Sequence, residues 1–199
     1  MKYDKSALSF EQQVDLLIRR GMTGDRNLMK SRLSAVNYYR LSGYWHPFRN
    51  PDDTFKKGTS FELIWNRYVF DRQLRLLVMD AIERIEVAVR SQLACHHSHN
   101  HGAFAYADAP KSLPKMTVME HNNFIHRVDE EVSRSKEQFV KHFQQKYGDQ
   151  HLFLPVWMVT EVMSFGTILT FFRGASHNVK QSVASSFGMP DVVFDSWLL

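Results

Sequence analysis

The chain of 199 residues has a single cysteine, Cys95. One thiol excludes a disulfide framework and any zinc site built from several thiolates. The chain also lacks an apolar run of the roughly 18 residues that a membrane-spanning helix needs, and residues 1–10 are too polar for a signal peptide. We therefore expect a soluble, cytoplasmic protein with no membrane partner.

Proline and glycine are scarce, with 6 and 9 residues, while 44% of the residues are hydrophobic and 23% are charged. This composition excludes collagen-like, low-complexity and largely disordered chains. Lysine and arginine total 25 against 21 aspartate and glutamate, and ten histidines add positive charge below neutral pH. The mild basic excess permits a nucleic-acid partner but does not require one.

Apolar residues recur at three- and four-residue spacing through most of the chain, which predicts an all-α protein. Ser9 and Gln12 have the spacing of a capping box before the first helix. The longest pattern covers residues 59–101, where neither proline nor glycine occurs. Residues 41–59 are expected to form a loop with a short hairpin-like excursion. The other expected helices cover residues 25–40, 118–147, 154–172, 178–187 and 191–199.

These elements divide into an N-terminal helical extension with an aromatic and basic loop, residues 1–58, and a helical bundle, residues 59–199. The sequence stops at Trp197, Leu198 and Leu199, three large apolar residues in mid-helix. We therefore expect the bundle to be truncated at its C-terminus, with an apolar groove that seats a second subunit.

Four histidines follow Arg90 at the end of the longest predicted helix: His96, His97, His99 and His101. Because zinc ligands normally come from two elements, we expect no metal here, and the simplest interpretation is imidazoles placed favourably on the helix dipole. As a ribonuclease site, Arg90 would clamp a phosphate while His96 or His97 moves a proton. Spacing alone does not decide, since chance gives roughly two such Arg–His spacings in this composition.

A second cluster, residues 37–49, interleaves aromatic and basic side chains that can stack on bases and hold phosphates of single-stranded RNA. Its candidate contacts are Tyr39, Arg40, Trp45 and His46. The structural alternative, which carries more weight, is that such aromatics fasten a helix end to the core.

Charged residues at helical spacing supply two further candidates. Glu86 and Arg90 are four residues apart and predict an ordinary surface ion pair. The alternative is a role for Glu83 or Arg84 in a polar bundle interior, and Arg84 is also a candidate nucleic-acid contact. Glu161 shares an apolar helix face with Trp157, which predicts a buried polar partner for its carboxylate.

The collinear order of several segments resembles the Abi-like family of bacterial phage-defence proteins, which includes AbiD and AbiF. The resemblance is carried by residues 8–13, 20–22, 37–44, 70–75, 82–90, 155–167 and 195–198. It implies an α-helical fold of HEPN type and a role in abortive infection through RNA, with a non-coding RNA as one candidate partner. It also implies metal-independent cleavage, without a cofactor, by an arginine and a histidine that act across a dimer or a domain pair. A homodimer is the expected assembly.

The sequence departs from this family where the family's Arg-Asn-containing motif with two histidines is expected, shortly after Trp197. Either the motif is absent from a truncated chain, which then binds RNA without cutting it, or Arg90 with His96 and His97 serves in its place. The unfinished C-terminus favours truncation. The alternative function is a non-enzymatic, antitoxin-like module that binds a protein partner.

Overall fold

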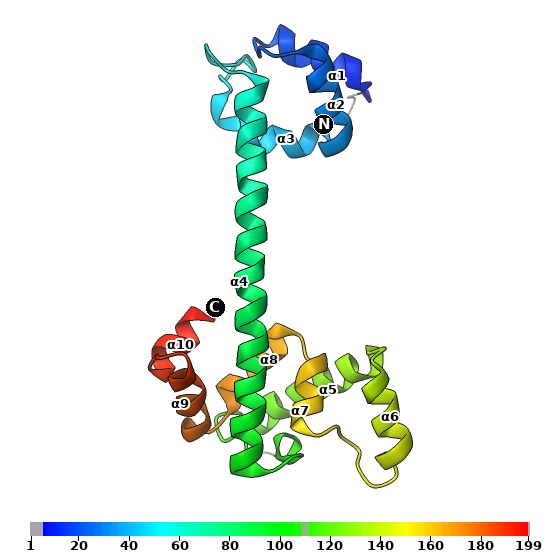
Figure 1. Cartoon of the computed structure of the whole chain (residues 1–199), viewed down its shortest axis with the longest axis vertical. Coiled ribbons are helices and arrows are strands. Elements are labelled where there is room, and N and C mark those ends of the chain that lie inside the picture. The colour runs from blue at the N-terminus through cyan, green and yellow to red at the C-terminus, as the bar shows by residue number, and fades with distance from the viewer. Residues whose placement is uncertain (1–5, 109–110, 199) are drawn as a thin grey trace. The chain divides into compact units, whose positions relative to one another are not determined.

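The computed structural model describes residues 6–108 and 111–198. These residues form ten α-helices, two short 3-10 helices and no strand, which confirms the prediction of an all-α protein (Figure 1). Two isolated β-bridges join Thr23 to Ser60 and Arg49 to Phe55. No helix in the described ranges combines the length and apolar character needed to cross a membrane.

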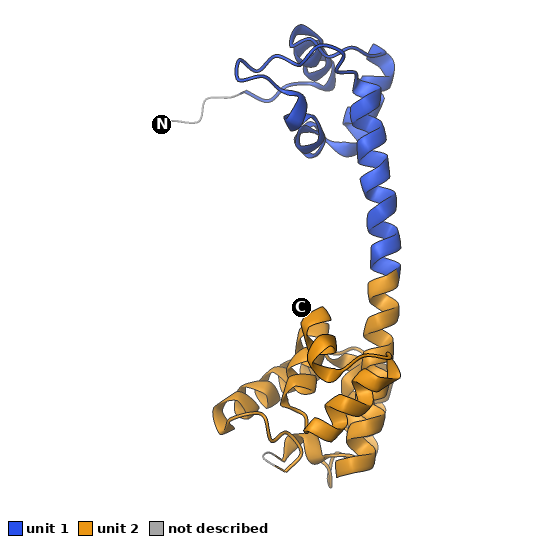
Figure 2. Cartoon of the chain, turned by 90° about the vertical axis from the view of Figure 1, so that its left-hand side faces the viewer, with its two compact units in different colours: residues 1–80 blue, residues 81–199 orange. Residues whose placement is uncertain are grey.

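By its internal contacts the chain divides into two compact units, residues 1–80 (unit 1) and residues 81–199 (unit 2), coloured separately in Figure 2. The division falls inside α4 (Phe61–His101), an uninterrupted helix as the lack of proline and glycine predicts. The domain boundary expected from the sequence, after residue 58, stays a prediction.

Unit 1 packs three short helices against the first turns of α4: α1 (Phe10–Arg19), α2 (Arg26–Val36) and α3 (Tyr38–Trp45). The predicted capping box is confirmed, because Gln12 N donates to Ser9 Oγ (3.3 Å) and Ser9 N donates to Gln12 Oε1 (2.8 Å). The helices share a core of buried apolar side chains: Val14, Leu17, Met22, Met29, Leu33, Leu41, Trp45, Phe55, Phe61 and Ile64.

The helix is interrupted at Asn37, where the sequence predicts a continuous helix over residues 25–40. The φ of Asn37 is 73°, a left-handed value that asparagine adopts more readily than most residues. Its Oδ1 accepts a hydrogen bond from Tyr39 N (2.9 Å) and so caps α3. The expected loop therefore begins later, after the 3-10 helix η1 (His46–Phe48), and the bridge between Arg49 and Phe55 confirms its hairpin-like excursion.

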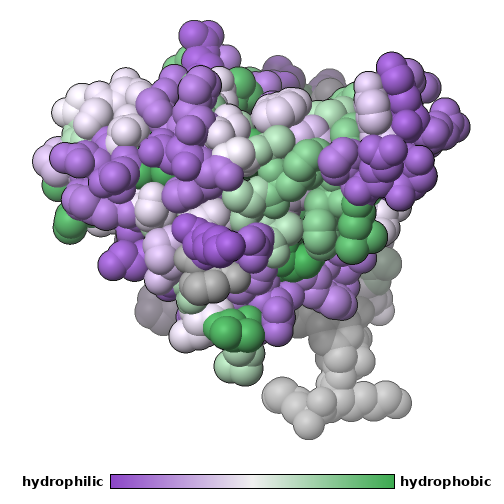
Figure 3. Space-filling view, turned by 90° about the horizontal axis from the view of Figure 1, so that it is seen from below, coloured by the Kyte–Doolittle hydropathy of each residue, from purple (hydrophilic) through white to green (hydrophobic). Residues whose placement is uncertain are grey.

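Unit 2 packs six helices and the 3-10 helix η2 (Ala105–Ala107) against the last turns of α4. The helices are α5 (Val118–Arg134), α6 (Gln138–Tyr147), α7 (Val156–Val162), α8 (Phe165–Gly174), α9 (His177–Ser186) and α10 (Asp191–Trp197). Residue 199, the end of the last expected helix, lies outside the described residues. Seen from below, hydrophilic residues cover much of the surface and hydrophobic residues form a band between them (Figure 3).

Two expected helices of unit 2 are each broken in two. The helix expected over residues 118–147 is interrupted at Ser135, whose backbone is extended. The helix expected over residues 154–172 ends at Val162, and Ser164 starts α8 by accepting a hydrogen bond from Thr167 N (3.3 Å). An N-capping serine inside an apolar run competes with continuation of the helix, and here it prevails.

The first half of the helix expected over residues 154–172 is α7. Its residues Glu161 and Trp157 face solvent, and Trp157 is 53% exposed. The prediction of a buried partner for Glu161 is therefore wrong. The apolar character of the neighbouring sequence belongs to the opposite side of α7, where Val156 and Val159 are fully buried.

Candidate functional site

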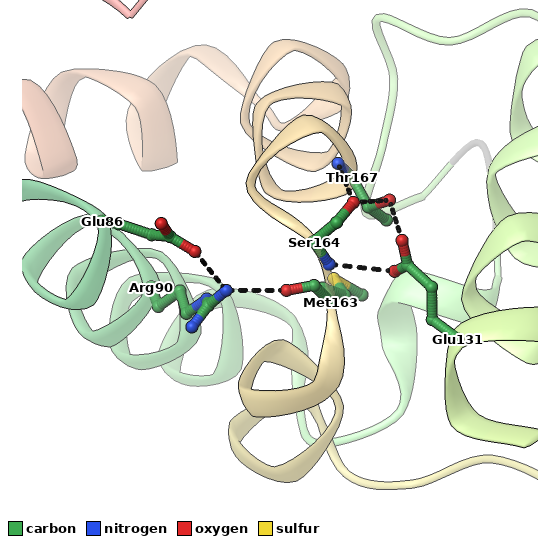
Figure 4. A network of polar contacts seen from close by, with 6 residues as sticks. All are labelled: Glu86, Arg90, Glu131, Met163, Ser164 and Thr167. Carbon is green, nitrogen blue, oxygen red and sulfur yellow. Dashed lines mark hydrogen bonds and ion pairs between the residues drawn. The ribbon is translucent and has the colours of Figure 1, made fainter. Parts of the chain in front are cut away.

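Arg90 occupies the junction between α4 and the α7–α8 turn in unit 2 (Figure 4). Its Nη2 donates to Glu86 Oε1 (2.5 Å), which confirms the predicted ion pair, and to the backbone oxygen of Met163 (2.8 Å). The pair is largely buried, with side-chain exposures of 17% for Arg90 and 27% for Glu86, so it is not an ordinary surface pair. Met163 is the C-cap residue that follows α7, so the guanidinium lies where the carbonyl end of that helix favours a cation.

Glu131 of α5 holds the other side of the same turn (Figure 4). Its Oε2 accepts from Ser164 N (3.1 Å), and its Oε1 accepts from Thr167 Oγ1 (2.9 Å). A carboxylate at the amino end of α8 is favourable for the same electrostatic reason that a guanidinium is favourable at the end of α7. Arg90 and Glu131 thus fix the turn that separates the two helices.

His97 is sealed in the core of unit 2. Its side chain has no exposed surface, its ring centroid is 4.9 Å from that of Phe171, and neither ring nitrogen has a partner among the described residues. Burial, with a smaller contribution from His101, lowers the pKa of His97 to about 4. The imidazole is therefore neutral at pH 7 and has no access to a substrate in this conformation.

The predicted catalytic residues Arg90, His96 and His97 are not brought together around one exposed space. His97 lies on the same side of α4 as Arg90 but two turns further on, with Cα atoms about 10 Å apart. His96 points elsewhere and lines a shallow cavity of about 470 Å³ formed with residues of α9. Arg90 Nη2 already donates to Glu86 and Met163, and Arg90 Nε is buried without a partner among the described residues.

The remaining histidines at the end of α4 form local contacts. His99 Nδ1 lies 2.8 Å from the Cys95 backbone oxygen, and the rings of His97 and His101 are 5.1 Å apart. The described ranges contain no group of three His, Cys, Asp or Glu side chains arranged to hold a metal ion.

A groove of about 620 Å³ opens in unit 1, and we call it the unit 1 groove. Three segments build it: the first helix with its leading residues, the start of α3, and the hairpin-like loop after η1. Its lining consists of Ser6, Leu8, Gln13, Leu16, Arg20, Asn37, Tyr38, Tyr39, Ser42, Trp45, Arg49 and Asp53.

Asp53 positions two guanidinium groups in the unit 1 groove. Its Oδ2 accepts from Arg20 Nη2 (3.2 Å), and its Oδ1 pairs with Arg49. Arg20 Nη1 also donates to the Tyr38 hydroxyl (3.4 Å). Two guanidinium groups against one carboxylate leave a net positive charge at the groove.

The predicted nucleic-acid contacts have different environments. Tyr39 lines the unit 1 groove and is 85% exposed, so its ring is available for stacking. Trp45 is only 1% exposed and packs edge-on against Tyr38 (centroids 4.9 Å apart), which makes it a core residue. Arg40 and His46 are exposed on unit 1, whereas Arg84 is exposed on α4 in unit 2 and is no part of the groove.

Sequence reasoning missed Arg20 and Gln13 as groove residues, and it included Arg49 in the cluster of residues 37–49 without naming it as a contact. Arg20 follows α1 and Arg49 follows η1, so only the tertiary fold brings them together around Asp53. The four-residue spacing of Arg49 and Asp53 was the one local signal. The distribution of charge between the units is consistent with a basic groove in unit 1. Residues 1–80 hold 14 lysines and arginines against 9 acidic residues, whereas residues 81–199 hold 11 against 12.

Comparison with known proteins gives one match. The model of a family described as Abi-like protein matches residues 31–199. The match takes in α3 and every helix of unit 2, while α1 and Arg20 precede it. None of the curated proteins and none of the solved structures matches the chain.

Replacing Arg90 tests its role in holding the α7–α8 turn. We expect Arg90→Ala to lower the free energy of unfolding by about 2 kcal/mol, because it removes two charge-assisted hydrogen bonds and leaves the Met163 carbonyl unpaired. The matched control is Arg134→Ala, which breaks an exposed pair with Glu130 at the same spacing and is expected to cost less than about 0.5 kcal/mol. Urea unfolding followed by circular dichroism measures both, and equal losses would contradict the assignment.

The buried imidazole of His97 makes stability depend on pH. Its pKa is about 4 in the folded chain and near the ordinary histidine value of 6.5 in the unfolded chain. Between pH 4 and pH 6.5 the unfolded chain binds the proton and the folded chain does not. The contribution of neutral His97 to the free energy of unfolding is therefore at its maximum above pH 6.5, and it falls by about 3 kcal/mol as the pH is lowered to 4. We expect His97→Leu to remove this part of the pH dependence, whereas the exposed His142→Leu retains it. Parallel stability curves for wild type and His97→Leu would contradict the prediction.

Proposed function

The chain belongs to the Abi-like protein family, which acts in abortive infection and phage defence, and from this premise we propose that it acts there by binding single-stranded RNA in the unit 1 groove. The observation that carries the proposal is the position of one exposed aromatic ring beside two guanidinium groups. Tyr39 offers a stacking face, and Arg20 and Arg49 are held by Asp53 in the same groove.

Each part of the groove suits one part of an RNA strand. A base stacks on an exposed tyrosine ring irrespective of sequence, because every base has a flat face. Arginine forks pair with phosphate oxygens and remain charged at any cellular pH. The excess of basic residues in unit 1 supplies the longer-range attraction to a polyanion.

Gln13 adds a group suited to reading a base edge. Its Nε2 donates to the Leu8 backbone oxygen (3.0 Å), while its Oε1 is buried and has no partner among the described residues. A buried acceptor without a partner costs free energy. The Gln13 side chain must turn toward the groove before an amino group of a base can supply the missing hydrogen bond.

The proposal is binding rather than cutting. The alternative role for Arg90, His96 and His97 as a metal-independent ribonuclease site requires His97 to leave its buried position and Arg90 to release Glu86 and Met163. The geometry therefore supports RNA binding best. Cleavage by this family's chemistry, the HEPN-type fold and the AbiD or AbiF subtype stay predictions from the resemblance.

Replacing groove residues tests the proposal by fluorescence anisotropy with an end-labelled single-stranded RNA at low salt. We expect Tyr39→Ala to weaken binding roughly tenfold through lost stacking, while Tyr39→Phe retains the affinity. Arg20→Ala and Arg49→Ala should each reduce the slope of log affinity against log salt by about 0.7. Tyr147→Ala, which removes a tyrosine 42% exposed on unit 2, is the control without effect.

The same mixtures report on cleavage. We expect the RNA to be recovered intact with and without a chelator. Absence of binding by the wild type at low salt, or equal affinity of Tyr39→Ala and wild type, would contradict the proposal. Chelator-resistant cleavage that is lost in His96→Ala would replace it with the ribonuclease function.

A further inference from the structure

The Asp53 carboxylate bridges two guanidinium groups in the unit 1 groove. One of its oxygens, Oδ2, accepts a hydrogen bond from Arg20 Nη2 (3.2 Å), and the other, Oδ1, pairs with Arg49. The two guanidinium groups are therefore held at the spacing of a single anion with two oxygens. A phosphodiester offers arginine the same kind of partner, because two of its oxygens share one negative charge.

These ion pairs lie where an anion from solvent can reach them. The exposed fractions of the side chains are 27% for Arg20, 34% for Arg49 and 47% for Asp53. Ion pairs in contact with water contribute little to stability, so a second anion can compete with the carboxylate. A phosphodiester carries the same charge as Asp53, and its exchange for the carboxylate leaves the charge at the two arginines unchanged.

The loop that carries Asp53 is held by hydrogen bonds that do not involve the Asp53 side chain. Asn50 N donates to the Thr54 backbone oxygen (2.8 Å), and Thr54 N donates to Asp52 Oδ1 (3.0 Å). The carboxylate of Asp53 can therefore turn away from the arginines while the backbone of the loop keeps its conformation.

We propose that Arg20 and Arg49 form a subsite for one phosphate group of the bound RNA, and that Asp53 occupies this subsite in the free protein and leaves it when the phosphate enters. The inference rests on the proposed function and assigns one part of the strand to one part of the groove. The Tyr38 hydroxyl, which accepts from Arg20 Nη1 (3.4 Å), keeps that arginine in place during the exchange. Competition by the internal anion lowers the apparent affinity, because only molecules whose subsite is open bind the phosphate.

Replacing Asp53 tests the exchange by fluorescence anisotropy with end-labelled single-stranded RNA. We expect Asp53→Asn to bind about fivefold more tightly than wild type, because a neutral amide competes poorly for the two arginines. Asparagine suits the position, since the φ of Asp53 is 69°, a left-handed value that asparagine adopts readily. The matched control is Asp52→Asn, which removes the same charge one residue away and keeps the oxygen that Thr54 N contacts. We expect it to change the affinity by less than about twofold, because salt screens a charge outside the subsite.

The salt dependence of binding tests whether one phosphate is shared by both guanidinium groups. For a shared phosphate, the double variant of Arg20→Ala and Arg49→Ala reduces the slope of log affinity against log salt by about 0.7, as each single variant does. Two separate phosphates would give about 1.4. In this double variant the subsite is lost, so Asp53→Asn should tighten binding no more than Asp52→Asn does.

The outcomes distinguish the subsite from the proposed function. If wild type binds RNA but Asp53→Asn binds no more tightly than Asp52→Asn, or if the double variant loses about 1.4 in slope, the subsite is overturned and RNA binding stands. A gain from Asp53→Asn that persists in the double variant also overturns the subsite. If neither wild type nor Asp53→Asn binds RNA at low salt, the proposed function fails and the subsite fails with it. Urea unfolding verifies that every variant is folded.

Discussion

The structure depends on one uninterrupted helix, α4, which supplies buried side chains to two separate cores. Phe61 and Ile64 serve unit 1, and Val89 and Leu93 serve unit 2. A substitution at any of these four positions therefore changes both a core and the helix α4. Other apolar side chains of α4 are exposed, among them Leu76, Leu77 and Met79.

The two units have different chemical character. Unit 1 gathers the excess positive charge and holds Arg20 and Arg49 by a single carboxylate beside the exposed Tyr39. Unit 2 uses its charged residues inside the fold, where Arg90 and Glu131 hold the α7–α8 turn. In unit 1 two guanidinium groups share one carboxylate and leave a net positive charge beside an exposed ring, so unit 1 is the better candidate for contact with RNA.

Much of the fold can be predicted from interactions between residues that are close together in the sequence. The all-α class, the capping box at Ser9 and the uninterrupted α4 are predictable because each depends on neighbouring residues. The breaks at Asn37 and Ser164 were missed, since a capping residue inside an apolar repeat competes with helix continuation and tertiary packing decides the outcome. The site was predicted in part: Tyr39 has the expected exposure, but Trp45 and His97 are buried and Arg20 joins from a distant segment.

Hydrogen–deuterium exchange of α4 tests most directly the claim that one helix supplies side chains to both cores. Exchange of backbone amides reports local opening of a helix, which is frequent where few apolar contacts support it. The account predicts strong protection of the amides near Ile64 and near Val89 and Leu93, whose side chains are buried, and faster exchange over residues 70–87, whose apolar side chains are exposed. Uniformly rapid exchange along α4, including the amides near Ile64 and Leu93, would contradict it.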